Sequence, residues 1–359
     1  IVAHKRPQIE VVFVLDTTSS MSGMIQAAKE NIWSIASTMA SAQPAPEIKM
    51  GLVAFRDRGD AYVTKVFDLS EDLDGMYATL MDFKPQGGGD GPESVNQALH
   101  DAVSNISWSD NRSSYKTIFL VGDAPPHMDY QNDVKFPQSI ALATRKGIVV
   151  NTIQAGQDVQ TTSAWRKIAS LSQGRYFNVA DEGAHVAVAT PFDSEIATLS
   201  KELDETRFFY GAAEERAMSE LKTAASEKLH ALASAASRAK RALFNASESG
   251  LNNFRGNKEL VEDISSGEVA LDDLADAVLP ESIRALPAPE RQAEIDRQAK
   301  KREDLSAKIA ALAKQRQAYV EKELAGDKDL ADSLDHQIYE TVAEQAKEKG
   351  LRYEGGPKY

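Results

Sequence analysis

The sequence contains no cysteine, few aromatic residues (7%) and no long apolar run. The absence of cysteine excludes disulfide bonds, thiol nucleophiles, thiolate zinc sites and thiolate-bound iron–sulfur clusters. No apolar stretch approaches the ~20 residues that a membrane-spanning helix needs, and no signal-peptide pattern is visible. We therefore expect a chain that folds around an aliphatic core, without covalent cross-links and without a membrane span.

The charge balance and the missing motifs exclude further classes of function. Asp and Glu (54) outnumber Lys and Arg (41), which gives a formal net charge of −13. Because nucleic-acid binding depends on cationic contacts to phosphate, we do not expect nucleic acid as a partner. The sequence has no GxSxG, HExxH, P-loop or GxGxxG motif, the signatures of common hydrolases, nucleotide-binding proteins and dehydrogenases. We therefore do not expect an enzyme.

Strand-like and helix-like patterns alternate over roughly the first 210 residues. Apolar, β-branched runs predict strands at 9–15, 48–55, 61–67, 115–121, 147–154 and 175–179, the last as an edge strand. Helical patterns lie between them, at about 22–39, 70–83, 93–106, 135–146 and 160–173. This alternation predicts an α/β fold with a doubly wound, mostly parallel sheet and helices on both faces.

The remainder of the chain is rich in helix formers and shows no strand pattern. We expect an α/β domain over 7–208 and an all-α extension over 209–359. The stretch 212–247 reads as one long helix, ended by a segment rich in Ser, Gly and Asn. Apolar residues from Ile295 to Tyr319 follow a heptad-compatible stripe with charged interruptions, which favours an antiparallel hairpin or small bundle at least as much as a coiled coil.

Three oxygen-bearing side chains follow the first predicted strand. Asp16, Thr18 and Ser20 are spaced two apart, directly before the first helix. A turn can bring their carboxylate and two hydroxyls to one point, and such hard oxygen donors suit Mg²⁺, Mn²⁺ or Ca²⁺. The alternative interpretation is structural, with Ser20 capping the helix and Asp16 bonded to nearby backbone amides.

Two further loops add carboxylates at the same edge of the predicted sheet. Asp90 lies in GGGDGPES, which precedes a helix, and Asp123 lies in GDAPPH, which follows the fourth predicted strand. Ligands of parallel sheets bind at the carboxyl ends of strands, near the point where the strand order reverses. The sequence therefore predicts a cation site formed by Asp16, Thr18, Ser20, Asp90 and Asp123.

These segments resemble the von Willebrand factor A (vWA) domain family and its metal-ion-dependent adhesion site. The family pattern Asp-x-Ser/Thr-x-Ser is matched by Asp16, Thr18 and Ser20, and the aspartate of the third loop by Asp123. The second loop of the family normally supplies a threonine, which GGGDGPES lacks. This variant is similar to vWA domains found beside atypical alpha-kinases and in bacterial proteins. The resemblance covers roughly residues 7–208.

The resemblance implies a divalent cation, Mg²⁺ or Ca²⁺ with Mn²⁺ as a further candidate. Thr18 and Ser20 would bind it directly, and Asp16 and Asp123 directly or through water. In adhesive members a carboxylate of the partner protein completes the coordination. If Asp90 binds the cation directly, a third carboxylate offsets its charge and the site is closed and structural; if Asp90 faces a water, the open position remains.

Four nearby residues are weaker candidates. Asp57 and Asp60 read as parts of a polar hairpin turn, and Glu93 suits the start of a helix after proline. His127 follows Pro126 in the third predicted loop and is a candidate to line the site. None of these four residues has a spacing that specifies a ligand or a catalytic base.

The resulting expectation is a non-catalytic, divalent-cation-dependent protein-binding module with a helical scaffold, spacer or oligomerisation element. One alternative is a structural cation site, with binding or homo-oligomerisation carried by the helices. Another is a metal-dependent hydrolase with Asp90, Glu93 or His127 as its base. The absence of cysteine, the lack of a starting methionine and the bacterial resemblance favour an extracytoplasmic location, periplasmic or secreted, although a cytoplasmic fragment would have the same sequence features.

Overall fold

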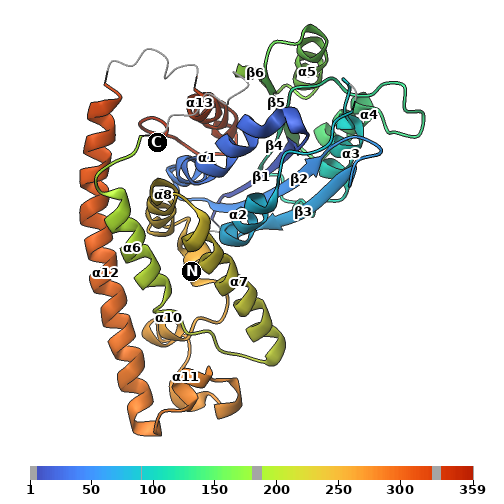
Figure 1. Cartoon of the computed structure of the whole chain (residues 1–359). Coiled ribbons are helices and arrows are strands. Elements are labelled where there is room, and N and C mark those ends of the chain that lie inside the picture. The colour runs from blue at the N-terminus through green and yellow to red at the C-terminus, as the bar shows by residue number, and fades with distance from the viewer. Residues whose placement is uncertain (1–5, 90, 180–187, 326–332, 359) are drawn as a thin grey trace. The chain divides into compact units, whose positions relative to one another are not determined.

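The computed structural model describes residues 6–89, 91–179, 188–325 and 333–358. The chain forms two compact units, an α/β unit and a helical unit (Figure 1). The α/β unit contains the chain up to residue 187 and again from 326, and the helical unit spans 188–325. The helical unit is therefore an insertion, whereas the sequence predicted one boundary near 208 and a terminal extension.

A six-stranded sheet forms the centre of the α/β unit. Its strands are β1 (Gln8–Asp16), β2 (Glu47–Phe55), β3 (Thr64–Ser70), β4 (Tyr115–Gly122), β5 (Ile148–Ala155) and β6 (Tyr176–Val179). Their order is β3-β2-β1-β4-β5-β6, and every neighbouring pair is parallel except β2 and β3. The predicted doubly wound, mostly parallel sheet is confirmed, with β6 at an edge.

Helices cover both faces of this sheet (Figure 1). They are α1 (Ser22–Ala40), α2 (Leu73–Asp82), α3 (Val95–Ser104), α4 (Phe136–Arg145), α5 (Val159–Leu171) and α13 (Leu334–Lys347). Because side chains alternate along a strand, Val12 and Val14 of β1 pack with α3, α4 and α5 in one core cluster. Phe13 and Leu15 of β1 face the other side, with α1, α2 and α13.

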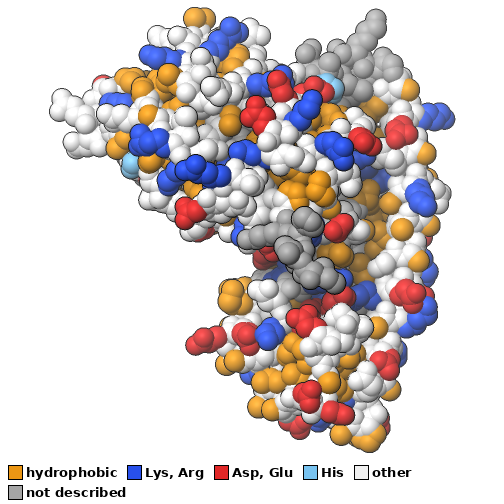
Figure 2. Space-filling model, turned by 180° about the vertical axis from the view of Figure 1, so that it is seen from behind, with side chains coloured by type: hydrophobic (Ala, Val, Ile, Leu, Met, Phe, Trp, Pro, Cys, Tyr) orange, Lys and Arg blue, Asp and Glu red, His pale blue; other side chains and the backbone are white. Residues whose placement is uncertain are grey.

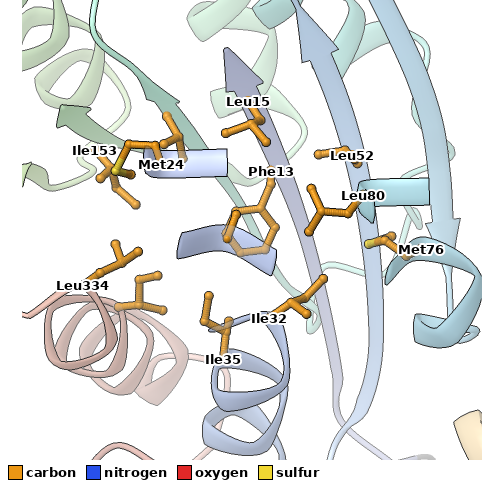
Figure 3. A pocket seen from close by; sticks show the side chains of 13 residues that line it. Phe13, Leu15, Met24, Ile32, Ile35, Leu52, Met76, Leu80, Ile153 and Leu334 are labelled. Carbon is orange, nitrogen blue, oxygen red and sulfur yellow. The ribbon is translucent and has the colours of Figure 1, made fainter. Parts of the chain in front are cut away.

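An apolar cavity of about 50 Å³ lies on this second side of the sheet, and Figure 3 shows its lining. Phe13, Leu15, Met24 and Ile32 meet Leu334 of α13 around it, and every lining side chain is apolar. The volume is well below the ~150 Å³ of an engineered cavity that holds benzene. The cavity is therefore a small packing gap, and α13 closes the core of the α/β unit.

Polar contacts also join the returning C-terminal segment to the sheet. Gln345 of α13 donates from Nε2 to Asn151 Oδ1 (2.9 Å), and its Oε1 accepts from the Tyr115 hydroxyl (2.7 Å). Gln43 and Arg352 form an isolated antiparallel bridge farther along the chain. These contacts explain why the end of the chain belongs to the α/β unit although its composition matches that of the helical unit.

The helical unit consists of seven α-helices within its described residues 188–325. They are α6 (Asp193–Asp204), α7 (Ala213–Leu232), α8 (Ala235–Asn245), α9 (Leu251–Arg255), α10 (Leu260–Ser265), α11 (Glu281–Arg284) and α12 (Ala288–Glu323). The single helix expected over 212–247 is divided into α7 and α8. Ser234 causes the division, because its side chain accepts a hydrogen bond from Ser237 N (3.1 Å) and caps α8.

The core of the helical unit lies where α12 runs beside α6 and α8 (Figure 1). Leu305 and Ile309 of α12 pack against Ile196 of α6 and Ala239 of α8. The apolar stripe predicted in the sequence is thus used for packing inside one small bundle. Basic and acidic side chains are interspersed on the surface of this unit (Figure 2). On α12, Arg297, whose side chain is 68% exposed, is paired with Glu294. None of the described helices is long and apolar enough to cross a membrane.

Candidate metal centre

The first loop places one carboxylate and two hydroxyls together. Asp16, at the end of β1, is 1% exposed, and its Oδ1 accepts hydrogen bonds from Thr18 N (2.9 Å) and Thr18 Oγ1 (2.7 Å). Thr18 Oγ1 lies 3.3 Å from Ser20 Oγ, and Ser20 is exposed. The α1 helix has no side-chain cap, so Ser20 does not have the capping role of the structural alternative. Its hydroxyl instead faces the same point as Asp16 and Thr18.

The second carboxylate oxygen of Asp16 is the clearest sign of a cation. Asp16 Oδ2 is buried and has no hydrogen-bond partner among the described residues. A buried carboxylate oxygen without a donor is costly, whereas a divalent cation would satisfy it. Burial raises the pKa of Asp16 to about 7, the hydrogen bonds from Thr18 oppose that rise, and the charge of Asp123 adds to it.

Asp123 belongs to the loop that follows β4. It is half-buried, and its charge acts on Asp16. Gly122, the residue before it, allows the close approach of β4 to this site, because a Cβ there would lie 3.1 Å from Asp16 Cβ and 3.0 Å from the Trp165 ring. The parallel pairing of β1 with β4 thus brings Asp16 and Asp123 to one edge of the sheet, as the sequence predicted.

The second loop is joined to the first loop and to the turn after β2. Gly87 O accepts from Ser19 Oγ (2.9 Å), and Gly88 N donates to Asp60 Oδ2 (3.0 Å). Gly87 and Gly88 have φ values of +82° and +80°, which glycine adopts readily. Asp90 lies outside the described residues, so its expected role as a ligand stays a prediction.

The turn after β2 holds its polar groups in internal hydrogen bonds. Asp57 accepts from Ser94 Oγ (2.8 Å) and from the Tyr130 hydroxyl (2.8 Å). His127 places Nε2 3.3 Å from Asp57 Oδ2 and Nδ1 2.8 Å from Asp129 Oδ1. Because both ring nitrogens of His127 face carboxylates, this residue supports the loop rather than the site.

Glu93 is the residue whose importance the sequence did not reveal. It lies two residues before α3 rather than at the start of the helix, is 3% exposed, and its Oε2 has no hydrogen-bond partner among the described residues. Burial, followed by the charges of Asp16 and Asp57, raises the pKa of Glu93 to about 9. Carboxyl groups with a pKa raised in this way are more frequent at functional sites than elsewhere in proteins. The sequence signal was weak, since proline before glutamate is common at helix starts.

The donor set fits a hard divalent cation. Asp16, Thr18, Ser20 and Asp123 offer only oxygen, the ligand type that Mg²⁺ and Ca²⁺ prefer. Within the described ranges, no group of three or more acidic or histidine side chains could hold a metal ion by itself. A cation at this place would therefore need the hydroxyls of Thr18 and Ser20 as ligands, and Asp16 Oδ2, which has no hydrogen-bond partner among the described residues, would be available to bind it.

The raised pKa of Asp16 predicts how a cation changes stability with pH. In the metal-free chain the folded state keeps the Asp16 proton up to about pH 7, whereas the unfolded state loses it near 3.8. This difference lowers the free energy of unfolding as pH rises between those values. A cation replaces the proton, so added Mg²⁺ should raise the melting temperature more at about pH 8 than at about pH 5. Calorimetric melting with Mg²⁺ and with a chelator measures this, and an equal rise at both pH values would contradict it.

A comparison with protein families identifies one family for this chain. The sequence model of the von Willebrand factor A domain matches residues 10–190, just over half of the chain. No curated protein matches the chain. Similar solved structures include proximal thread matrix protein 1 from the mussel byssus in a second crystal form, with 17% identity and a TM-score of 0.39 over 49% of this chain and 43% of that one.

Two further structures are similar at the same level. The mussel protein with a zinc-occupied MIDAS motif shows 18% identity and a TM-score of 0.40, over 49% of this chain and 43% of that one. The SpRpn10 VWA domain shows 14% identity and a TM-score of 0.37, over 49% of this chain and 89% of that one. The chain thus spans less than half the length of the mussel structures that it matches.

Proposed function

The chain belongs to the von Willebrand factor A domain family, and from this we propose that its α/β unit is a non-catalytic module that binds another protein through a divalent cation. The observation that carries the proposal is the buried Asp16, whose Oδ2 lacks a hydrogen-bond partner among the described residues and lies beside two hydroxyls. Mg²⁺ and Ca²⁺ are the cations that this donor set favours.

The exposure of the first loop supports a role in contacts with a partner. Asp16 and Thr18 are buried, whereas Ser19 and Ser20 are exposed on the same loop. A cation held by Asp16, Thr18 and Ser20 would therefore lie between the protein interior and the solvent. A partner group could reach it from the solvent side and complete its coordination, as the resemblance implies.

The proposal of a non-catalytic role rests on the surroundings of His127, one of the side chains that the sequence offered as a base. A hydrolase needs a base that faces a metal-bound water. His127 lies between Asp57 and Asp129, with its Nδ1 2.8 Å from Asp129 Oδ1 and its buried Nε2 facing Asp57 Oδ2, so the ring is directed to these carboxylates. We therefore favour binding over hydrolysis. The extracytoplasmic location stays a prediction of the sequence.

A second candidate function concerns the helical unit. Its α7 helix carries exposed apolar side chains at Met218 and Leu221, adjacent on one face of the helix. Such a face favours an interaction or oligomerisation element, as the alternative from the sequence states. Sedimentation of the whole chain at rising concentration tests this: a mass that rises in the wild type and not in Leu221→Lys would assign oligomerisation to α7.

The cation-dependent function is tested with displayed peptides. Random peptides on phage are bound to the immobilised whole chain in Mg²⁺ and released with EDTA. We expect clones that bind the wild type in Mg²⁺ and fail to bind Asp16→Asn, because that variant should hold no cation. Clones that bind both proteins equally, or no EDTA-sensitive clone, would contradict the proposal.

A further inference from the structure

We infer that Glu93 is an additional carboxylate of this cation site, so that the loaded site repels carboxylates and accepts a neutral oxygen or a basic group from its partner. The inference rests on the proposed function and deepens it, because it concerns the same site. Glu93 lies outside the ligand set that the sequence predicted, and the expected ligand of its loop was Asp90.

The backbone of Glu93 is fixed to the loop that carries Asp123. Glu93 N donates to Pro125 O (2.9 Å), and Glu93 O accepts from His127 N (3.1 Å). Glu93 and Pro126 form an isolated parallel bridge. These bonds hold the segment before α3 against the third loop. The backbone from which the Glu93 side chain extends is therefore fixed by that loop.

The side chain of Glu93 is directed to the first loop. A Cβ built on Gly88 would lie 3.1 Å from Glu93 Oε1 and 3.1 Å from Thr18 Cβ. The Glu93 carboxylate and the Thr18 side chain therefore pack against the same glycine. A larger residue at Gly88 would also be strained by its φ of +80°, so glycine makes this approach possible.

Two carboxylate oxygens in this region are buried without a hydrogen bond from any described residue. Glu93 Oε2 and Asp16 Oδ2 are both buried, and neither has a hydrogen-bond partner among the described residues. The charge of Arg56 favours ionised Asp16, but Arg56 donates no hydrogen bond to either oxygen. Its Nη2 instead donates to Lys84 O (2.9 Å), and its guanidinium lies over the Tyr62 ring. A single cation near Thr18 would satisfy both oxygens, Asp16 Oδ2 directly and Glu93 Oε2 through a water, because no three acidic or histidine side chains of the described residues are grouped closely enough to hold the ion by themselves.

The chemistry of the partner follows from the charge. Asp16, Asp123 and Glu93, together with the charges of Asp57 and Asp60 that act on Glu93, give five negative charges. The cation and the nearby Arg56 supply three positive charges, so the loaded site keeps an excess of negative charge. A site with excess negative charge attracts an incoming carboxylate less than one with excess positive charge. The group that completes the site is therefore a carbonyl or hydroxyl oxygen, or a Lys or Arg side chain beside it.

Calorimetric titration of Mg²⁺ into the chelator-stripped whole chain tests the assignment. We expect Glu93→Gln to weaken Mg²⁺ binding by at least about tenfold. The matched control Glu47→Gln, at the start of β2 and hence at the other edge of the sheet, should bind like the wild type. Glu93→Asp, which keeps the charge but shortens the side chain, should give an intermediate affinity, and melting curves in EDTA confirm that each variant is folded.

The outcomes separate this inference from the proposed function. Wild-type affinity in Glu93→Gln together with lost binding in Asp16→Asn would overturn the role of Glu93 alone. No Mg²⁺ binding by the wild type would overturn both proposals.

The class of the partner group is tested by adding acetate to the Mn²⁺-loaded chain and measuring the relaxation of water protons, which falls when acetate displaces water from the ion. Acetate should leave the relaxation of the wild type unchanged, and a fall caused by acetate in the wild type would overturn the charge argument.

Discussion

The Asp16→Asn variant should lose the cation-induced rise in melting temperature and should melt higher than the wild type when both are metal-free. The side chain is 1% exposed, and burial raises its pKa to about 7, so above that pH the folded metal-free chain contains a buried, partly unpaired charge. Asparagine keeps an oxygen that accepts from Thr18 N and Oγ1 but carries no charge. The substitution therefore removes the main anionic ligand and a source of instability together.

The size of the effect follows from two opposing contributions. Loss of the charge removes a penalty of about 1.4 kcal/mol for each pKa unit of the shift. The amide nitrogen of asparagine takes the place of Asp16 Oδ2, which has no hydrogen-bond partner among the described residues. The amide nitrogen is therefore buried without an acceptor, which costs about 1–3 kcal/mol. A net gain of ~1–3 kcal/mol remains above neutral pH, and each kcal/mol corresponds to about 2–4 °C in a chain of this size.

A matched substitution controls for the loss of one acidic group. Asp110 is exposed and precedes β4, so it lies at the opposite edge of the sheet from Asp16. Asp110→Asn should melt like the wild type in EDTA and in Mg²⁺. A cation-induced rise in Asp16→Asn equal to that of Asp110→Asn would show that Asp16 does not hold the cation.

Replacing Arg316 by alanine should destabilise the helical unit by about 3–5 kcal/mol, the usual cost of breaking a buried ion pair. Arg316 of α12 is 1% exposed, and its Nε donates to Asp193 Oδ1 of α6 (2.9 Å). Thr190 also donates to Asp193, from its backbone N (2.8 Å) and from Oγ1 (2.9 Å). Without Arg316 the Asp193 charge stays buried, and the donors that remain to it among the described residues are these neutral ones.

Urea unfolding followed by far-UV circular dichroism measures this loss, with a matched control on the same helix. Arg297 of α12 is paired with Glu294, but its side chain is 68% exposed. Exposed pairs of this kind contribute only ~0.2–0.5 kcal/mol, so Arg297→Ala should barely change the midpoint of unfolding. Equal midpoints for Arg316→Ala and Arg297→Ala would contradict the structural role of the buried pair.

The strands of the α/β unit could be predicted because buried parallel strands are short, uninterrupted apolar runs. The run 9–15 predicted β1, which spans Gln8–Asp16. The prediction for β3 began three residues early, at 61. Residues 61–63 belong to the turn after β2, and β3 begins at Thr64, which pairs with Phe55.

The organisation of the helices was harder to predict because it depends on contacts between distant residues. The residues around Ser234 are rich in alanine on both sides, so local helix propensity concealed the end of α7 and the start of α8. The return of α13 depends on the contacts of Gln345 with Asn151 and Tyr115, far apart in the sequence. No local pattern in the C-terminal segment distinguishes it from α12.

The residues of the candidate site also differ in whether the sequence could predict them. Asp16, Thr18 and Ser20 lie within five residues, so their spacing alone predicted that they converge. Glu93 could not be identified in this way, because its burial depends on Gly88 and on the bonds to the third loop. In the sequence it is one glutamate after a proline, and its unpartnered Oε2 becomes visible only in the fold.

Titration of Mg²⁺ into the metal-free wild-type chain near pH 7, in two buffers of different ionisation enthalpy, tests the central claim most directly. The account predicts one cation for each chain and a release of protons on binding, because the cation displaces the proton that the buried Asp16 holds near this pH. The heats measured in the two buffers should therefore differ. The absence of binding, or binding without proton release, would contradict a cation site built on Asp16.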